Sequence, residues 1–382
     1  MTVSVIVPIY HGKKYIENLI HQAEECQKKV KEDIQIELVL SNDDPKESLD
    51  EYISKNVEIV VLNTNVNRGI QGARVQGLKQ CKGDYVVFLD QDDSIYPNYV
   101  GSQIQAIGEA DAVVCRTINE GKLKYNETQP FEKLITKEYM LSKGNPIVST
   151  GAVLIKRKSI PNEWIENLIR ENGADDYFLW LCMVGKKQKF ALNQEVLFER
   201  VVTGANTSLD SLKMMKSEQE MFAYLKGMQM FSDDIMNELQ TAIDEKRLRL
   251  LDKFRKMFFI LNSMMQTEES GQGIWRFLKK FGIKNIAIYG AGYVGQRLYS
   301  LLADTDINVE CFVDQNADYI EMPVKVCKFE EITNMVEAII VTLADNPEKM
   351  VERLKEKYPD KKVISIVRLL DSIGNKFDKS MQ

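Results

Sequence analysis

The sequence has no long apolar run, no closely spaced cysteine pair, and only two histidines in 382 residues. A membrane-spanning helix needs roughly 20 consecutive apolar residues, and no segment approaches that length. The six cysteines are scattered without a C-x-x-C pair, which argues against a zinc site and favours a reducing cytosol. The apolar N-terminus contains Pro8, so we expect a strand there and not a signal peptide.

The composition sets broad limits on fold and partners. Hydrophobic residues make up 44% and charged residues 28%, as in ordinary globular proteins. The formal net charge of −6 gives no basic excess, so no nucleic-acid partner is expected. The length is sufficient for two or three domains.

The first hundred residues alternate β-branched apolar runs with helical stretches. The apolar runs occupy residues 3–10, 34–40, 57–62 and 85–89. This alternation predicts an α/β fold in which helices cover a parallel sheet. Ligands of such sheets bind beyond the carboxyl ends of the strands, where polar residues follow three of these runs.

The most informative of these polar segments is Asp90-Gln91-Asp92-Asp93, directly after the run at 85–89. Neighbouring carboxylates about 4 Å apart repel each other by ~1 kcal/mol in water and by more in a cleft. They therefore favour a bound cation, and hard oxygen ligands suit Mg²⁺ or Mn²⁺. The alternative is a solvated acidic loop with no ligand.

Four segments together resemble the N-terminal half of family 2 glycosyltransferases with the GT-A fold: Val5–Tyr10, Ser41–Asp43, Asn67–Gly77 and Gly83–Asp93. Further on, Ser149–Arg157 followed by Asp175–Leu181 resembles the acceptor-side segment and catalytic acidic motif of the same family. The resemblance spans roughly residues 1–210. It implies a nucleotide-diphospho-sugar transferase domain with a mixed, mostly parallel sheet.

The resemblance also implies roles for individual residues. Donor binding would fall to Pro8, Tyr10, Asn42, Asp43, Arg74 and Asp90. Asp92 and Asp93 would hold the metal, and Asp176, beside Asp175, would take the proton from the acceptor hydroxyl. Three of these assignments have a structural alternative. Asp43 could stabilise a turn, and Arg74 could form a structural ion pair. Asp175-Asp176 could cap the N-terminus of a helix.

The function implied is inverting transfer of a sugar, most simply from a UDP-sugar with Mn²⁺ or Mg²⁺, to a glycan or lipid-linked acceptor. Surface-polysaccharide synthesis in the cytoplasm, at the inner face of the membrane, would fit it. One departure is Thr203, which stands where relatives often carry a histidine, while His11 follows Tyr10 at the expected nucleotide site. A second hypothesis is a nucleotide-sugar-binding or assembly subunit with weak catalysis.

Beyond residue 210 the sequence becomes rich in methionine and charged residues. Residues 211–272 predict two long amphipathic helices whose Met and Phe stripes suit core packing. Basic-aromatic segments at 253–259 and 275–281 suit an anionic membrane surface instead. A homo-oligomer is also left open.

Residues 273–382 resemble the small Rossmann-like domains attached to enzymes of polysaccharide synthesis. A strand at 284–289 leads into Gly290, Gly292 and Gly295, and a second strand ends at Asp314. This order is typical of a nucleotide or NAD(P) site. The alternative is that the glycines only permit close packing of helix and strand. Bound NAD(P) would allow a third hypothesis, sugar-nucleotide oxidoreduction in this domain.

Overall fold

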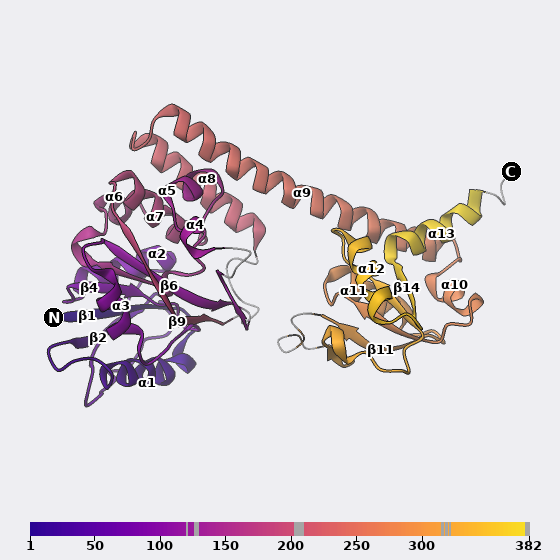
Figure 1. Cartoon of the computed structure of the whole chain (residues 1–382), viewed down its shortest axis with the longest axis horizontal. Helices are drawn as coiled ribbons and strands as arrows, with labels where there is room; N and C mark the ends of the chain where they lie inside the picture. Colours follow the sequence, from indigo (N-terminus) through magenta and orange to yellow (C-terminus); the bar gives the residue numbers. More distant parts are fainter. Residues whose placement is uncertain are drawn as a thin grey trace. The chain divides into compact units, whose positions relative to one another are not determined.

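The structure, a computed structural model, describes residues 1–119, 121–125, 130–201, 210–314, 317, 320 and 322–378. The chain forms two compact units, Met1–Glu245 and Lys246–Gln382 (Figure 1). The helical region expected at 211–272 is helical, but it is divided between the two units. The three-part division into 1–210, 211–272 and 273–382 stays a prediction.

The N-terminal unit is built on a mixed sheet. Its strands follow the order β3-β2-β1-β4-β8-β6-β9-β5, and β7 pairs with β6. The strands are β1 (Thr2–Ile9), β2 (Gln35–Asn42), β3 (Glu58–Leu62), β4 (Tyr85–Phe88), β5 (Ser94–Ile95), β6 (Ala112–Asn119), β7 (Lys122–Leu123), β8 (Val153–Lys156) and β9 (Phe190–Arg200). The first four strands pair in parallel, while β8 is antiparallel to both β4 and β6.

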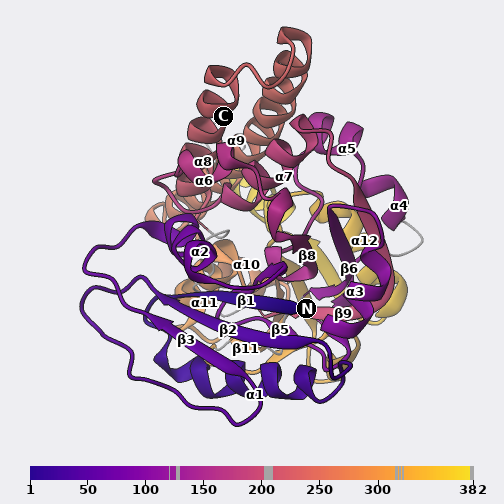
Figure 2. The same ribbon diagram turned by 90° about the vertical axis from the view of Figure 1, so that its left-hand side faces the viewer.

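Helices cover both faces of this sheet. Figure 2 shows α1 and α2 on opposite sides of the N-terminal strands. The helices are α1 (Ile16–Gln27), α2 (Gly69–Gln80), α3 (Tyr99–Ile107), α4 (Phe131–Leu134), α5 (Lys137–Ser142), α6 (Asn162–Glu166), α7 (Asp175–Gly185) and α8 (Ser211–Gly227). The α/β class predicted from the sequence is confirmed.

The core of this unit consists of the β-branched strand residues and the helix faces that pack on them. Val5, Val39 and Val87 on neighbouring strands are fully or almost fully buried. Because strands buried on both faces carry continuous apolar runs, the sequence signal for them was strong. The carboxyl ends of β1, β2 and β4 lie together at one edge of this sheet.

The helix α9 (Asp233–Glu269) belongs to both units. Ile243 packs in the core of the N-terminal unit, and Ile260 packs in the core of the C-terminal unit. No helix in the described part of the chain is both long and apolar enough to span a membrane.

The C-terminal unit has a five-stranded parallel sheet with the order β12-β11-β10-β13-β14. Its elements are α10 (Ile274–Lys280), β10 (Asn285–Tyr289), α11 (Tyr293–Leu302), β11 (Asn308–Val313), β12 (Val326–Cys327), β13 (Ala338–Val341), α12 (Pro347–Lys357), β14 (Lys362–Ser365) and α13 (Ile366–Asp378). The strand, glycine turn, helix and strand expected at 284–313 are present. All six cysteine thiols of the protein are free and buried.

Candidate active site

The polar segments that follow β1, β2 and β4 meet at one cavity, as the parallel order predicted. The register pairs Ile9 with Asn42 and Ile6 with Phe88, so these three strands end side by side. The cavity has a volume of about 690 Å³. Of the site residues predicted in this unit, its walls include Pro8, Tyr10, Asp43, Arg74, Asp90, Asp92, Asp93, Asp175 and Asp176.

Asn42 is the predicted donor-binding residue that does not line the cavity. It is buried, and its amide donates to the Glu47 carbonyl (2.6 Å) and to Asn63 Oδ1 (2.9 Å). Its own Oδ1 accepts the Asp44 N–H at 3.1 Å. In this structure Asn42 therefore fixes the loop after β2, and a direct contact with a donor is not supported.

Asp43 lies at the cavity wall with little exposure. Its Oδ1 accepts the backbone N–H of Arg68 at 2.8 Å, and its own N–H donates to the Ile9 carbonyl at 2.8 Å. Burial raises the pKa of Asp43, although the N–H groups of Arg68 and Gly69 oppose that shift. Asp43 therefore links the end of β1, through its backbone N–H, to the start of α2, through its carboxylate, while it still lines the cavity.

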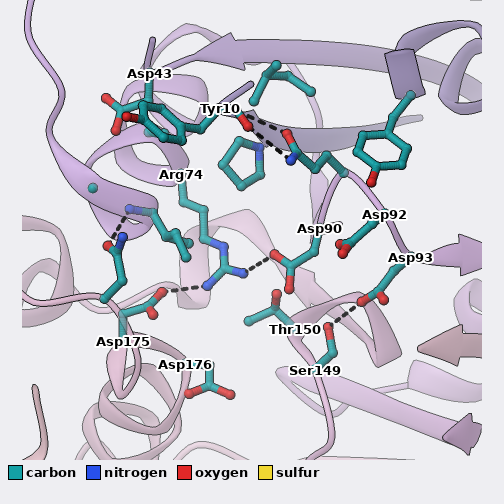
Figure 3. A pocket seen from close by; sticks show the side chains of 18 of the residues that line it. Tyr10, Asp43, Arg74, Asp90, Asp92, Asp93, Ser149, Thr150, Asp175 and Asp176 are labelled. Carbon is teal, nitrogen blue, oxygen red and sulfur yellow. Dashed lines mark hydrogen bonds and ion pairs between the residues drawn. The ribbon is translucent and has the colours of Figure 1, made fainter. Parts of the chain in front are cut away.

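Arg74 forms a clamp in the wall of the cavity (Figure 3). One guanidinium nitrogen contacts Asp90 Oδ1 and the other contacts Asp175 Oδ2, both at 2.5 Å. Burial alone would lower the pKa of Arg74, but the two carboxylates raise it well above its ordinary value. The clamp joins the acidic loop after β4 to the first turn of α7, which lies 101 residues from Arg74 in the sequence.

Asp176 lies beside this clamp, and its hydrogen bonds are made to other residues. Its Oδ2 accepts the side-chain amide of Asn145 at 2.9 Å, and its Oδ1 accepts the Tyr177 N–H at 2.6 Å. Burial first, and the neighbouring Asp175 carboxylate second, raise the pKa of Asp176 to about 7. A carboxyl with such a pKa is half ionised near neutral pH and can accept a proton from a hydroxyl.

Three residues of the acidic loop, Asp90, Gln91 and Asp93, have different neighbours. Asp90 pairs with Arg74, while the Gln91 side chain holds the Tyr10 backbone through two hydrogen bonds of 3.0 and 3.1 Å. Asp93 is buried and accepts from Ser149 Oγ (3.1 Å) and the Val201 N–H (3.0 Å). Burial, together with the charges of Asp90 and Asp92, raises the pKa of Asp93 well above its usual range.

Among the residues that the structure describes, no three His, Cys, Asp or Glu side chains are arranged to hold a metal ion by themselves. Mg²⁺ sites that also use substrate phosphates need only one or two carboxylates. Asp92 lines the cavity, so a metal held by Asp92 and a diphosphate fits the residues present. The contacts of Asp93 favour a structural role, and its role as a metal ligand stays a prediction.

Several lining residues had no signal in the sequence. Thr150 is buried, and its Oγ1 has no hydrogen-bond partner within the part of the chain that the structure describes. An unpaired buried hydroxyl facing a cavity is suited to a ligand. Lys14 and Arg200 add cationic groups to the walls. Asn145 was likewise not predicted, because only the fold brings it to Asp176.

Two expectations from the sequence concerned histidines, and both stay predictions. His11 lines the cavity, and its Nδ1 lies 2.7 Å from the buried Asp44 carboxylate. Thr203, which replaces a frequent histidine, lies outside the described residues.

The glycine segment of the C-terminal unit forms the expected tight turn. Gly290 has φ +104°, and a side chain at Gly295 would place its Cβ 2.0 Å from the Gly290 carbonyl oxygen. A side chain at Gly292 would meet nothing within 4 Å. Asp314 accepts the Ala291 N–H at 3.0 Å, so it already supports the turn. Binding of a nucleotide or NAD(P) here stays a prediction.

The comparison with known proteins identifies the N-terminal part. Residues 4–170 match the model of Glycosyl transferase family 2. The N-terminal unit therefore contains a glycosyltransferase family 2 domain, as the sequence resemblance indicated.

Two curated relatives illustrate the extent of the similarity. An uncharacterized glycosyltransferase of Rickettsia felis is 24% identical over 69% of this chain and 44% of its own length. A poly(ribitol-phosphate) beta-glucosyltransferase of Bacillus spizizenii is 25% identical over 74% of this chain and 45% of its own. The chain thus spans less than half the length of either relative.

The similarity to one solved structure is low. The crystal structure of S. aureus TarS 1-349 in complex with UDP-GlcNAc has a TM-score of 0.44 and 15% identity, covering 64% of this chain and 72% of that chain.

Proposed function

We propose that the N-terminal unit transfers a sugar from a nucleotide-diphosphate donor, a UDP-sugar in the simplest case, to a hydroxyl of an acceptor, with inversion at the anomeric carbon. The observation that carries this proposal is the Arg74 clamp, which brings the acidic loop and the helix of Asp176 to one cavity. A donor bound at the loop would then lie within reach of Asp176.

The donor side would use the ends of β1 and β2. The base would lie near Asp43 and the backbone from Pro8 to Tyr10, which Gln91 holds in place. Lys14 and Arg200 supply positive charge for the diphosphate. Asp92 would hold Mg²⁺ or Mn²⁺ against the diphosphate; when bound, the metal stabilises the charge that develops on the leaving group.

The acceptor side would use Asp176 as general base. The carboxylate takes the proton of the acceptor hydroxyl while that oxygen attacks the anomeric carbon, and the bond to the nucleotide diphosphate breaks. Asn145 donates to Asp176 and orients it. The name of the Bacillus spizizenii relative, a poly(ribitol-phosphate) beta-glucosyltransferase, supports a polymer hydroxyl as the acceptor. Synthesis of a surface polysaccharide at the cytoplasmic face of the membrane stays part of the proposal.

Replacing Asp92 by alanine is expected to remove the metal-dependent part of donor binding. A ligand at 100 times its dissociation constant stabilises the folded state by ~2.7 kcal/mol. We therefore expect that one nucleotide of the panel UDP, GDP, CDP and dTDP, added with Mn²⁺, raises the melting temperature of the wild type by roughly 5 °C. The same nucleotide should raise the melting temperature of Asp92→Ala by much less. Glu25→Ala, a change at a half-buried position of α1 that does not line the cavity, is the matched control. A shift that Mn²⁺ does not increase would contradict the metal assignment.

The transfer rate is expected to fall as the pH decreases through about 7. The base must be ionised, and the pKa of Asp176 is raised to about 7 by burial and Asp175. The limiting fall is roughly tenfold per pH unit below that value. The profile of kcat/KM between pH 5 and 9, measured as release of the nucleoside diphosphate with saturating metal, checks this. A flat profile across the range would exclude Asp176 as the base.

A further inference from the structure

A stripe of large apolar side chains is exposed along α9 within the C-terminal unit. It consists of Leu248, Leu251, Phe254, Phe258, Phe259 and Met265. Their exposed fractions range from 44% for Phe254 to 65% for Leu248. Single exposed apolar residues are ordinary, but six on one helix mark a surface that interacts with something.

The opposite side of the same helix packs against the core of the C-terminal unit. Ile260 and Met264 are buried in the core of the C-terminal unit. At roughly 100° per residue, Ile260 lies about 200° around the helix from Phe258. The stripe, defined by the six residues above, therefore does not serve to pack α9 onto its own unit.

Three residues of the stripe, Leu248, Leu251 and Phe254, lie in the most basic segment of the helix. Residues 246–256 carry six basic side chains and a single acidic one, although the whole chain has a net charge of −6. The acidic residue, Asp252, pairs with Arg255 (2.8 Å) and Lys256 (2.7 Å), and Lys256 also contacts Asp345 (2.9 Å). By formal charge the segment is therefore positive around these three residues.

We propose that this half of α9 binds an anionic lipid surface, with the stripe among the acyl chains and headgroups and the basic side chains near lipid phosphates. Phe and Leu on one face with Lys and Arg around it are typical of helices that lie in the membrane interface. A second copy of the chain would bring two basic segments together, which the charges oppose. A helix lying on the surface needs no membrane-spanning length, in agreement with the hydropathy of the described helices.

The test is co-sedimentation of the full chain with vesicles. Phosphatidylcholine vesicles that contain phosphatidylglycerol should bind the wild type, while phosphatidylcholine alone should bind it at least about tenfold less. The double change Leu251→Glu and Phe258→Glu should reduce binding at least about tenfold, because it places charge in the interface. Ile53→Glu, at a 92% exposed position of the N-terminal unit, is the matched control and should bind like the wild type.

A second pair of variants separates the charge from the apolar contribution. Lys253→Gln with Arg255→Gln should weaken binding to the anionic vesicles and reduce its salt dependence, with helix content unchanged in far-UV circular dichroism. Absence of wild-type binding would overturn the proposal. So would a dimer that Phe258→Glu dissociates while vesicles are not bound, since the stripe would then be an interface between copies. Membrane binding does not depend on the transfer reaction, so failure of either leaves the other testable.

Discussion

Replacing Arg74 by alanine is expected to destabilise the N-terminal unit by about 3 kcal/mol, because it leaves the buried Asp175 without its cation and removes the partner of the partly exposed Asp90. Transfer should also fall by roughly 100-fold or more, since the loop and α7 lose the link that sets their separation. Urea denaturation followed by tryptophan fluorescence measures the first effect. A Trp275→Phe background confines the signal to Trp164 and Trp180 in the N-terminal unit.

The control is another arginine of the same unit. The Arg170 side chain is 91% exposed and 4.0 Å from Glu220, so Arg170→Ala should change stability by less than about 0.5 kcal/mol. Arg74→Lys keeps the charge but cannot contact both carboxylates in the same way, and should fall between the wild type and Arg74→Ala. Adding Asp175→Asn to Arg74→Ala should restore part of the stability. If Arg74→Ala and Arg170→Ala changed the free energy of unfolding equally, the clamp would not stabilise the fold.

Asp176→Asn is expected to reduce transfer by about 10²–10⁴-fold while leaving donor binding unchanged, because the amide cannot accept the proton of the acceptor. The same substitution should stabilise the fold at alkaline pH. The pKa of this carboxyl is about 7 in the folded state and roughly 3.9 when unfolded, so its ionisation opposes folding increasingly between these values. The gain should be on the order of 1–3 kcal/mol above pH 7 and should vanish near pH 4.

The neighbouring carboxylate provides the matched comparison. Asp175→Asn removes a direct partner of Arg74 and should destabilise the unit, the opposite of the effect at Asp176. Thermal unfolding of both variants at pH 5 and pH 8, with nucleoside diphosphate release at pH 8, distinguishes the two roles. If Asp176→Asn retained wild-type transfer with any acceptor that the wild type uses, the general-base assignment would be wrong.

The parts of this site that could be predicted are those carried by short segments. The run at 85–89 followed by Asp90, Asp92 and Asp93 shows both a buried strand and its acidic end, because local hydrophobicity and charge determine each. The parallel order of β1, β2 and β4 follows from the alternating helices. Together they were sufficient to place the cavity at the carboxyl edge of the sheet.

The pairings across the cavity could not be predicted. The contact of Arg74 with Asp175 and that of Asn145 with Asp176 depend on how distant segments pack. Asn42 shows the limit of a motif: it precedes Asp43, yet its amide is used within its own loop. Asp93 also belongs to a motif but is used within the protein, because its oxygens accept hydrogen bonds from Ser149 and Val201.

The burial of every native thiol has a practical consequence for labelling. Cys26 and Cys182 each have a pKa raised to about 12 by burial, so almost none of either thiol is the reactive thiolate near neutral pH. All six cysteines are withdrawn from solvent, and no disulfide holds any of them. A maleimide dye or spin label should therefore react with one engineered surface cysteine without prior removal of the natural ones. Spectroscopic probes can thus be placed on either unit in an otherwise unaltered chain.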